Sequence, residues 1–177
     1  MIGVLVSGEG TNLQALLDES LPVIAVASDR PEAPALGRAR ARGIPARAFA
    51  AGEREERDRA MADWLEGRGV DLVVLAGYMR LLSPALLDRF PGRVLNVHPS
   101  LLPAFPGLRA VDRALAAGVR ETGATVHVVD EGVDTGPVLV QETVPVVPGD
   151  TPEILHRRIK RVEHRLLPHA VRGMLAA

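Results

Sequence analysis

Residues 2–17 read IGVLVSGEGTNLQALL and set the pattern for the rest of the chain. Ile2 to Val6 is a short apolar run rich in β-branched residues, as buried strands are. The glycine turn Ser7 to Gly10 follows, and leucines at positions 13, 16 and 17 then recur at helical spacing. The stretch therefore predicts a strand, a tight turn and a helix.

This alternation continues through the first two thirds of the chain. Apolar runs predict strands at 23–27, 46–49, 71–75 and 94–98, and helical patterns occupy 34–42, 53–67 and the segment that begins at Ser83-Pro84. In the helix at 53–67, Ala60, Met61, Trp64 and Leu65 form the apolar stripe, and most of the charges are expected on a solvated face. Strands alternating with helices predict an α/β fold with a doubly wound, mostly parallel sheet.

The last third has a different pattern. Strands are predicted at 125–129 and 137–144, separated by the turn-rich loop 130–136, so we expect an antiparallel C-terminal edge. Thr151-Pro152 starts a final helix, which Pro168 is expected to kink or end. The length of 177 residues is close to that of one typical domain, so we expect a single domain over 1–177.

Composition excludes several classes of protein. Apolar residues are 47% and charged residues 24% of the chain, which argues against disorder. A net charge of -1 gives no basic field for nucleic acid, and the absence of cysteine excludes disulfides and thiolate metal sites. The N-terminus lacks a secretory pattern and no apolar run reaches the length of a membrane helix, so we expect a cytoplasmic protein without membrane or nucleic-acid partners.

The glycine turn at Ser7 to Asn12 is the first candidate site. Glycines allow close approach of a ligand, and a helix N-terminus directs free N–H groups towards a phosphate. Leu13 stands where the dinucleotide fingerprint needs a third glycine, so a nicotinamide cofactor is not supported. Two alternatives remain open: the turn only joins a strand to a helix, or Asn12 caps that helix.

The second candidate is the predicted strand Val94 to His98. Residues two apart on a strand project to the same face, so Asn96 and His98 point together at its C-terminal end. An amide donor beside an imidazole can stabilise an oxyanion and move a proton, as attack on a carbonyl carbon requires. The alternative is a hydrogen-bonded pair in the core.

Asp134 is the third candidate, since Gly132 and Gly136 would let its loop reach into a cleft. A carboxylate close to His98 would favour a protonated, donating imidazole; the alternative is an ordinary turn residue. His127 lies between apolar neighbours and is expected to be structural, although it could face the same cleft. His98, His127 and Asp134 could bind zinc, but the chain lacks established zinc-ligand spacing and also lacks the G-x-S-x-G elbow of serine hydrolases.

Four stretches together resemble the formyltransferase family that uses 10-formyltetrahydrofolate. They are SGEGTN (7–12), VVLAGYMR (73–80), LNVHPSLLP (95–103) and VDTGP (133–137). The resemblance covers nearly the whole chain and implies the Rossmann-like formyltransferase fold. The N-terminal turn is similar to that of members whose acceptor is glycinamide ribonucleotide, in purine biosynthesis.

The resemblance also implies roles for individual residues. It implies that the catalytic residues are Asn96, His98 and Asp134. It implies that the phosphoribosyl substrate is held by Gly10, Thr11, Asn12 and Glu163. It implies that the formyl-folate is bound by Arg54, Met79, Arg80, Leu81, Leu82 and Asn96. Where some relatives have a lysine and two histidines, this chain has Ala104, Arg109 and Val111, so the phosphate contacts there are expected to differ.

The implied reaction is transfer of a formyl group from 10-formyltetrahydrofolate to the amine of the glycinamide substrate, with no metal. The short chain and its near-neutral charge argue against the relatives with an additional domain, one of which acts on initiator tRNA. Small molecules are the expected partners, and the chain is expected to be a monomer or a homodimer. The alternative from another class is a binding module that senses a phosphoribosyl ligand without turnover.

Overall fold

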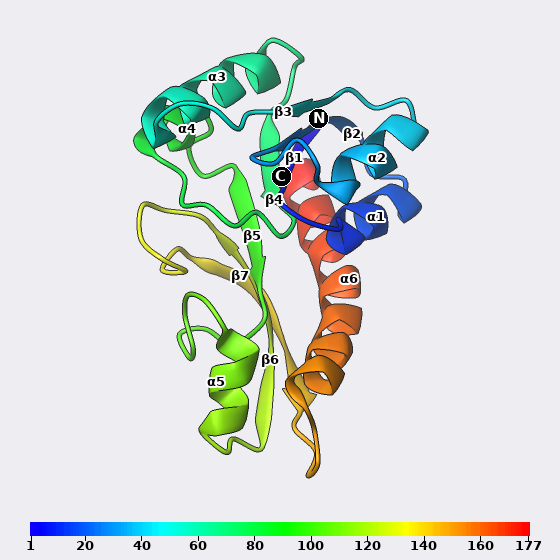
Figure 1. The fold of residues 1–177 in the computed structure, drawn as a ribbon, viewed down its shortest axis with the longest axis vertical. Coiled ribbons are helices and arrows are strands. Elements are labelled where there is room, and N and C mark those ends of the chain that lie inside the picture. Colours follow the sequence, from blue (N-terminus) through cyan, green and yellow to red (C-terminus); the bar gives the residue numbers. More distant parts are fainter. The chain divides into compact units, whose positions relative to one another are not determined.

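The computed structural model describes all 177 residues. The chain folds into two compact units, Met1–Asn96 and Val97–Ala177, and the boundary between them falls inside a strand. Figure 1 shows the helices and strands of both units. The expectation of a single domain over 1–177 stays a prediction.

The first unit is built around parallel strands. These are β1 (Ile2–Val6), β2 (Val23–Ser28), β3 (Ala46–Ala48), β4 (Leu72–Leu75) and the first residues of β5 (Val94–His98). They pair in the order β3-β2-β1-β4-β5, and every residue of β1 and β4 is buried. Leu75 pairs with both Leu5 and Asn96, so the carboxyl ends of β1, β4 and β5 lie side by side.

The helices of this unit follow the predicted pattern. They are α1 (Thr11–Asp18), α2 (Pro34–Ala41), α3 (Arg54–Glu66) and the single turn α4 (Pro84–Leu87). The predicted stripe of α3 is partly wrong, because Ala60 is exposed and Trp64 only half-buried, whereas Met61 and Leu65 are buried. Most of the charged side chains of α3 are exposed, as predicted, with two exceptions. Arg57 and Asp58 are both buried, with 3.4 Å between Nη2 and Oδ1.

The second unit contains an antiparallel pair of strands and a long helix. Its elements are α5 (Ala110–Ala116), β6 (Glu121–Val128), β7 (Val138–Pro145) and α6 (Pro152–Ala176). β6 and β7 pair antiparallel, with Val126 opposite Val140, and α6 packs along both strands. The predicted antiparallel edge is confirmed, although β6 begins at Glu121 rather than Thr125. The mostly parallel strands, the antiparallel pair and the final helix confirm the predicted α/β class.

Two helices of this unit differ from expectation. α6 begins as predicted, with the Thr151 hydroxyl accepting a hydrogen bond from the Ile154 N–H, but it continues through Pro168 to Ala176. The expectation that Pro168 ends the helix is wrong, because Pro168, Leu167 and Val171 are all buried and their packing outweighs the lost backbone hydrogen bond. α5 was not predicted. It has seven residues and follows Arg109 (φ 57), whose side chain makes no capping bond.

No helix combines the length and the apolarity needed to cross a lipid bilayer.

Candidate functional site

The glycine turn connects β1 to α1 and is fixed against α2. Gly10 is the N-cap of α1 in a left-handed conformation (φ 78), and a Cβ there would collide with Ala35. The Gly8 carbonyl accepts from the Ala35 N–H at 3.1 Å, and the Glu9 carbonyl accepts from Arg38 Nε at 2.6 Å. Because Gly10 occupies the cap position, the alternative that Asn12 caps α1 is wrong. The turn therefore presents the first N–H groups of α1 from a fixed backbone.

The predicted folate segment lies beside this turn. Residues 76–83 connect β4 to α4, and the Gly77 carbonyl accepts from the Ser7 N–H at 3.2 Å. The Met79 N–H in turn donates to Ser7 Oγ at 2.9 Å. Met79 and Leu81 are exposed while Leu82 is buried. The structure thus brings together the predicted phosphate turn and the segment 79–82. Arg54, the exposed first residue of α3, takes no part in these bonds.

Asn96 and His98 both lie on β5, where strand alternation directs their side chains to one face. Asn96 is half-buried and pairs in register with Leu75, at the carboxyl end of β4. His98 is buried. The structure thus places both residues at the carboxyl end of β5, and parallel α/β sheets bind ligands beyond that end of their strands.

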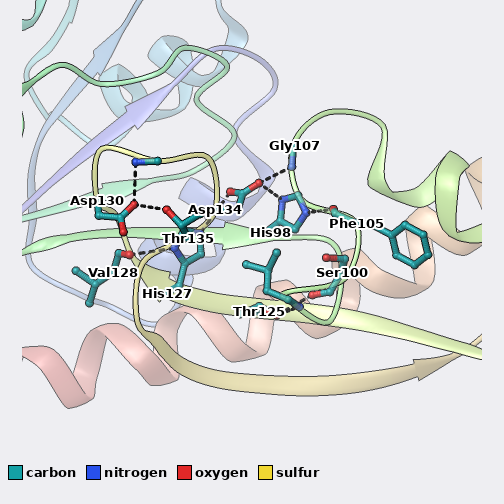
Figure 2. Close-up of polar contacts among 12 residues, drawn as sticks. His98, Ser100, Phe105, Gly107, Thr125, His127, Val128, Asp130, Asp134 and Thr135 are labelled. Carbon is teal, nitrogen blue, oxygen red and sulfur yellow. Dashed lines mark hydrogen bonds and ion pairs between the residues drawn. The ribbon is translucent and has the colours of Figure 1, made fainter.

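Asp134 contacts His98 directly, as Figure 2 shows. Asp134 Oδ2 lies 3.3 Å from Nδ1 of His98 and accepts a hydrogen bond of 2.7 Å from the Gly107 N–H. The other ring nitrogen of His98, Nε2, lies 2.8 Å from the carbonyl oxygen of Phe105. A carbonyl and a carboxylate only accept hydrogen bonds, so both nitrogens of His98 face acceptors. His98 is therefore held between two hydrogen-bond acceptors.

His127 also contacts this carboxylate, from the end of β6. Its Nε2 lies 3.5 Å from Asp134 Oδ1, and its Nδ1 lies 3.0 Å from the Val128 carbonyl oxygen. The sequence favoured a structural role for His127 and left open that it faces the same cleft, and this contact to Asp134 agrees with the second alternative. Asp134 therefore lies between two imidazoles.

The environment keeps Asp134 ionised. Burial alone would raise the pKa of this carboxyl group, but the hydrogen bonds from His127 and the Gly107 N–H, with the charge of His98, hold the pKa below its ordinary value. The group is thus a carboxylate at neutral pH.

The loop 130–136 is braced in a way that fixes Asp134. Asp130 Oδ1 accepts from the Gly132 N–H at 3.0 Å and from the Thr135 hydroxyl at 2.6 Å. Asp134 itself has φ 54, a left-handed conformation that Asp tolerates better than most residues. A Cβ on Gly136 would collide with the Val128 carbonyl oxygen. Glycine at 136 is therefore required by close packing of the two ends of the loop.

Two further expectations concern Glu163 and a metal. Glu163 lies on α6 and is 5% exposed. No group of three or more His, Cys, Asp or Glu side chains in the chain is arranged to hold a metal ion. The zinc alternative for His98, His127 and Asp134 is therefore not supported by their geometry.

Known proteins resemble this chain in sequence and in structure. Residues 1–171 match the formyl transferase family. The chain is 48% identical to the phosphoribosylglycinamide formyltransferase of Mycobacterium tuberculosis, over 97% of this chain and 83% of that protein. A crystal structure of glycinamide ribonucleotide transformylase 1 from Symbiobacterium toebii is 52% identical, with a TM-score of 0.94 over 97% of this chain and 85% of the other.

A longer relative matches over only part of its length. The trifunctional purine biosynthetic protein adenosine-3 of Drosophila melanogaster is 43% identical over 96% of this chain, which corresponds to 13% of that protein. The resemblance expected from the four sequence stretches is confirmed by these matches. The chain belongs to the formyl transferase family.

Proposed function

We propose that this chain transfers the formyl group of 10-formyltetrahydrofolate to the amine of N1-(5-phosphoribosyl)glycinamide, in the cytoplasm and as a step of purine biosynthesis. The names of relatives at 48% and 52% identity support this acceptor. The paired His98 and Asp134 support an acyl-transfer reaction, because such a reaction develops negative charge on a carbonyl oxygen.

The reaction begins when the neutral amine attacks the formyl carbon. A nitrogen–carbon bond forms, and the formyl oxygen becomes a tetrahedral oxyanion. The Asn96 amide and the His98 imidazolium donate hydrogen bonds to that oxygen, and Asp134 stabilises the charge on His98. The bond from the formyl carbon to the folate nitrogen then breaks, and the proton lost by the amine is transferred to that nitrogen. The sequence of steps needs neither a metal nor a covalent enzyme intermediate.

Substrate binding is assigned to the remaining predicted residues. Gly10, Thr11 and Asn12 hold the phosphate at the N-terminus of α1, whose backbone N–H groups favour an anion. Glu163 holds the amine end of the glycinamide. The folate is bound by Met79, Arg80, Leu81 and Leu82, with Arg54 and Asn96. The proposed assembly is a monomer or a homodimer.

One observation carries the proposal: both ring nitrogens of His98 face acceptors, at 2.8 Å and 3.3 Å. A cationic donor of this kind suits an oxyanion and does not suit a nucleophile-activating base, which needs a free lone pair. The arrangement therefore favours direct attack by the substrate amine over a covalent enzyme intermediate.

The test is a spectrophotometric assay of formyl transfer from 10-formyltetrahydrofolate, or from its 5,8-dideaza analogue, to glycinamide ribonucleotide. Wild type is compared with His98→Ala and with His169→Ala, a matched exposed histidine on α6. We expect turnover in wild type and in His169→Ala and its loss in His98→Ala. Folded wild type that binds both ligands without product formation would indicate a binding module, and release of formate without an acceptor would indicate a hydrolase.

A further inference from the structure

The segment between β4 and α4 presents apolar side chains to solvent without any regular secondary structure of its own. Met79 is 58% exposed and Leu81 52% exposed, whereas Tyr78 and Leu82 on either side are buried. A segment of this kind has few local hydrogen bonds to fix its conformation. The groups that hold it must come from elsewhere in the fold.

Two buried polar residues hold the first half of this segment. Ser7 Oγ accepts from the Met79 N–H at 2.9 Å and donates to Asp29 Oδ1 at 2.6 Å. The other oxygen of Asp29, Oδ2, accepts from Arg80 Nε at 2.8 Å. Ser7 and Asp29 are only 2% and 3% exposed. One carboxylate therefore fixes the backbone of Met79, through Ser7, and the side chain of Arg80.

The direction of these bonds follows from the chemistry of the groups. A serine hydroxyl has one proton, and a carboxylate only accepts, so the proton of Ser7 is directed to Asp29. The oxygen lone pairs of Ser7 are then left for the Met79 N–H. Burial works to raise the pKa of Asp29, but hydrogen bonds from Ser7 and Arg80 outweigh it and hold the pKa below the ordinary value. Asp29 is thus charged at neutral pH.

A second buried carboxylate holds the other end. Asp58 Oδ2 accepts from the Ser83 N–H at 2.6 Å, and Asp58 has no exposed surface. Arg57 lies beside it, with Nη2 3.4 Å from Oδ1. The segment is thus fixed at both ends while the side chains of Met79, Arg80 and Leu81 stay exposed. Of the two buried carboxylates, only Asp29 contacts one of these exposed side chains directly, that of Arg80.

We propose that Asp29, together with Ser7, is a positioning residue for the formyl-folate, holding Met79 and Arg80 in the conformation that receives it. This inference rests on the proposed function, because it takes residues 79–82 as the folate-binding segment. Asp29 touches neither reactant and acts through Ser7 and Arg80. Without it, the segment has to be ordered at the moment of binding, which weakens affinity for the folate. At saturating folate the segment is ordered again, so turnover is preserved.

The experiment compares Asp29→Asn with wild type and with a control, Asp71→Asn. Asparagine keeps the shape of Asp29 and removes the charge that pairs with Arg80. Asp71 is an exposed carboxylate of the same unit that pairs with the N-terminus and Arg93, remote from this segment in its contacts. Steady-state kinetics with 10-formyl-5,8-dideazafolate give KM and kcat, and calorimetry gives the Kd of that analogue and of glycinamide ribonucleotide.

We expect the KM and the Kd for the folate analogue to rise about 10-fold in Asp29→Asn, as for loss of a hydrogen bond to a charged group. We expect kcat and the Kd for glycinamide ribonucleotide to stay within about twofold of wild type. Asp71→Asn should match wild type throughout. Ser7→Ala, which removes the hydroxyl that accepts from Met79, should raise the folate KM in the same way and keeps the test available if Asp29→Asn does not fold.

Three outcomes would overturn the inference. The first is a lower melting temperature in Asp29→Asn with an unchanged folate KM, which indicates a purely structural role. The second is a fall in kcat at saturating folate that is as large as the expected rise in the folate KM, which indicates damage to the chemical step. The third is wild type that does not bind the folate analogue at all. Wild type that binds the analogue but transfers no formyl group would contradict the proposed function alone, since the Kd comparison between wild type and Asp29→Asn still decides this inference.

Discussion

The carbonyl oxygen of Phe105 accepts a hydrogen bond of 2.8 Å from Nε2 of His98. Because Nδ1 faces Asp134, Nε2 is the ring nitrogen that donates to the oxyanion in the proposed reaction. Phe105 has φ 51, a left-handed conformation that is uncommon for a bulky residue. Two residues further on, the Gly107 N–H donates to Asp134. The same loop therefore forms hydrogen bonds with both His98 and Asp134.

We expect the hydrogen bond between His98 Nε2 and the Phe105 carbonyl to break when the oxyanion of the reaction binds to Nε2. With a bisubstrate analogue that carries the tetrahedral centre, the Nε2–H signal of His98 in a nitrogen-15 NMR spectrum is expected to shift, while the signals of exposed His169 stay in place. An Nε2–H signal identical in free protein and complex would contradict the assignment of His98 as an oxyanion donor.

Removing the Asn96 amide should reduce turnover strongly. One oxyanion donor contributes roughly 2.7 to 4 kcal/mol, so Asn96→Ala is expected to lose about 100- to 1000-fold in kcat. Asn96→Asp keeps the size of the side chain but replaces a donor with a charged acceptor, and it should lose at least as much. The Kd for glycinamide ribonucleotide, measured by calorimetry, serves as the control for folding. A kcat near the wild-type value in Asn96→Ala would remove the residue from the catalytic assignment.

Neutralising Asp134 should reduce kcat while keeping the geometry. Asp134→Asn removes the negative charge beside His98, and a loss of at least about 100-fold in kcat is expected. His127→Gln removes the imidazole that contacts Asp134 Oδ1, and we expect kcat to fall about 10-fold. Glu131→Gln, on the exposed part of the same loop, is the matched control and should behave as wild type. Equal losses in all three variants would indicate general damage to the loop.

Glycine at position 136 is expected to be essential for the loop that carries Asp134. In Gly136→Ala the new Cβ would collide with the Val128 carbonyl oxygen, so we expect a destabilisation of about 1–3 kcal/mol and loss of activity. Gly173→Ala is the control, since a Cβ there meets nothing within 4 Å and the residue lies in α6. This control should gain about 0.5–1 kcal/mol in the free energy of unfolding. Thermal unfolding of both variants measures these changes.

Stability should fall as the pH drops below about 6.5. Burial, and then neighbouring Lys160, lower the pKa of His156 and of His164 below the ordinary value of 6.5, while Asp112 opposes the shift of His156. The unfolded chain then binds more protons than the folded one between the lowered pKa values and 6.5, so acid favours unfolding in that window. Asp29 and Asp134, whose pKa values are lowered from 3.8, lose their stabilising effect only in more acidic solution.

Urea unfolding at pH 5, 6 and 7 checks this expectation. A double variant, His156→Gln with His164→Gln, should show a smaller decrease in the free energy of unfolding from pH 7 to pH 5 than wild type. The same decrease in both proteins would mean that other groups cause the acid effect.

Features that depend on local order along the chain could be predicted from the sequence. The apolar run, glycine turn and leucine spacing of residues 2–17 predicted β1, the turn and α1, and Thr151-Pro152 predicted the start of α6. The two-residue spacing of Asn96 and His98 put them on one face of a strand. These predictions were possible because strand period, helix period and capping are local properties of the backbone.

Which distant residues meet was settled by tertiary packing alone. Asp29 lies 22 residues from Ser7 and 51 residues from Arg80, yet its carboxylate binds both. His127 reaches Asp134 only because loop 130–136 folds back on β6, and Arg57 and Asp58 are buried on a helix whose charges are mostly solvated. Such contacts follow from the packing of whole elements, which also stabilises α6 through Pro168 and forms α5 without a capping side chain. No local sequence pattern encodes that packing, because its free energy comes from surfaces that are far apart in the chain.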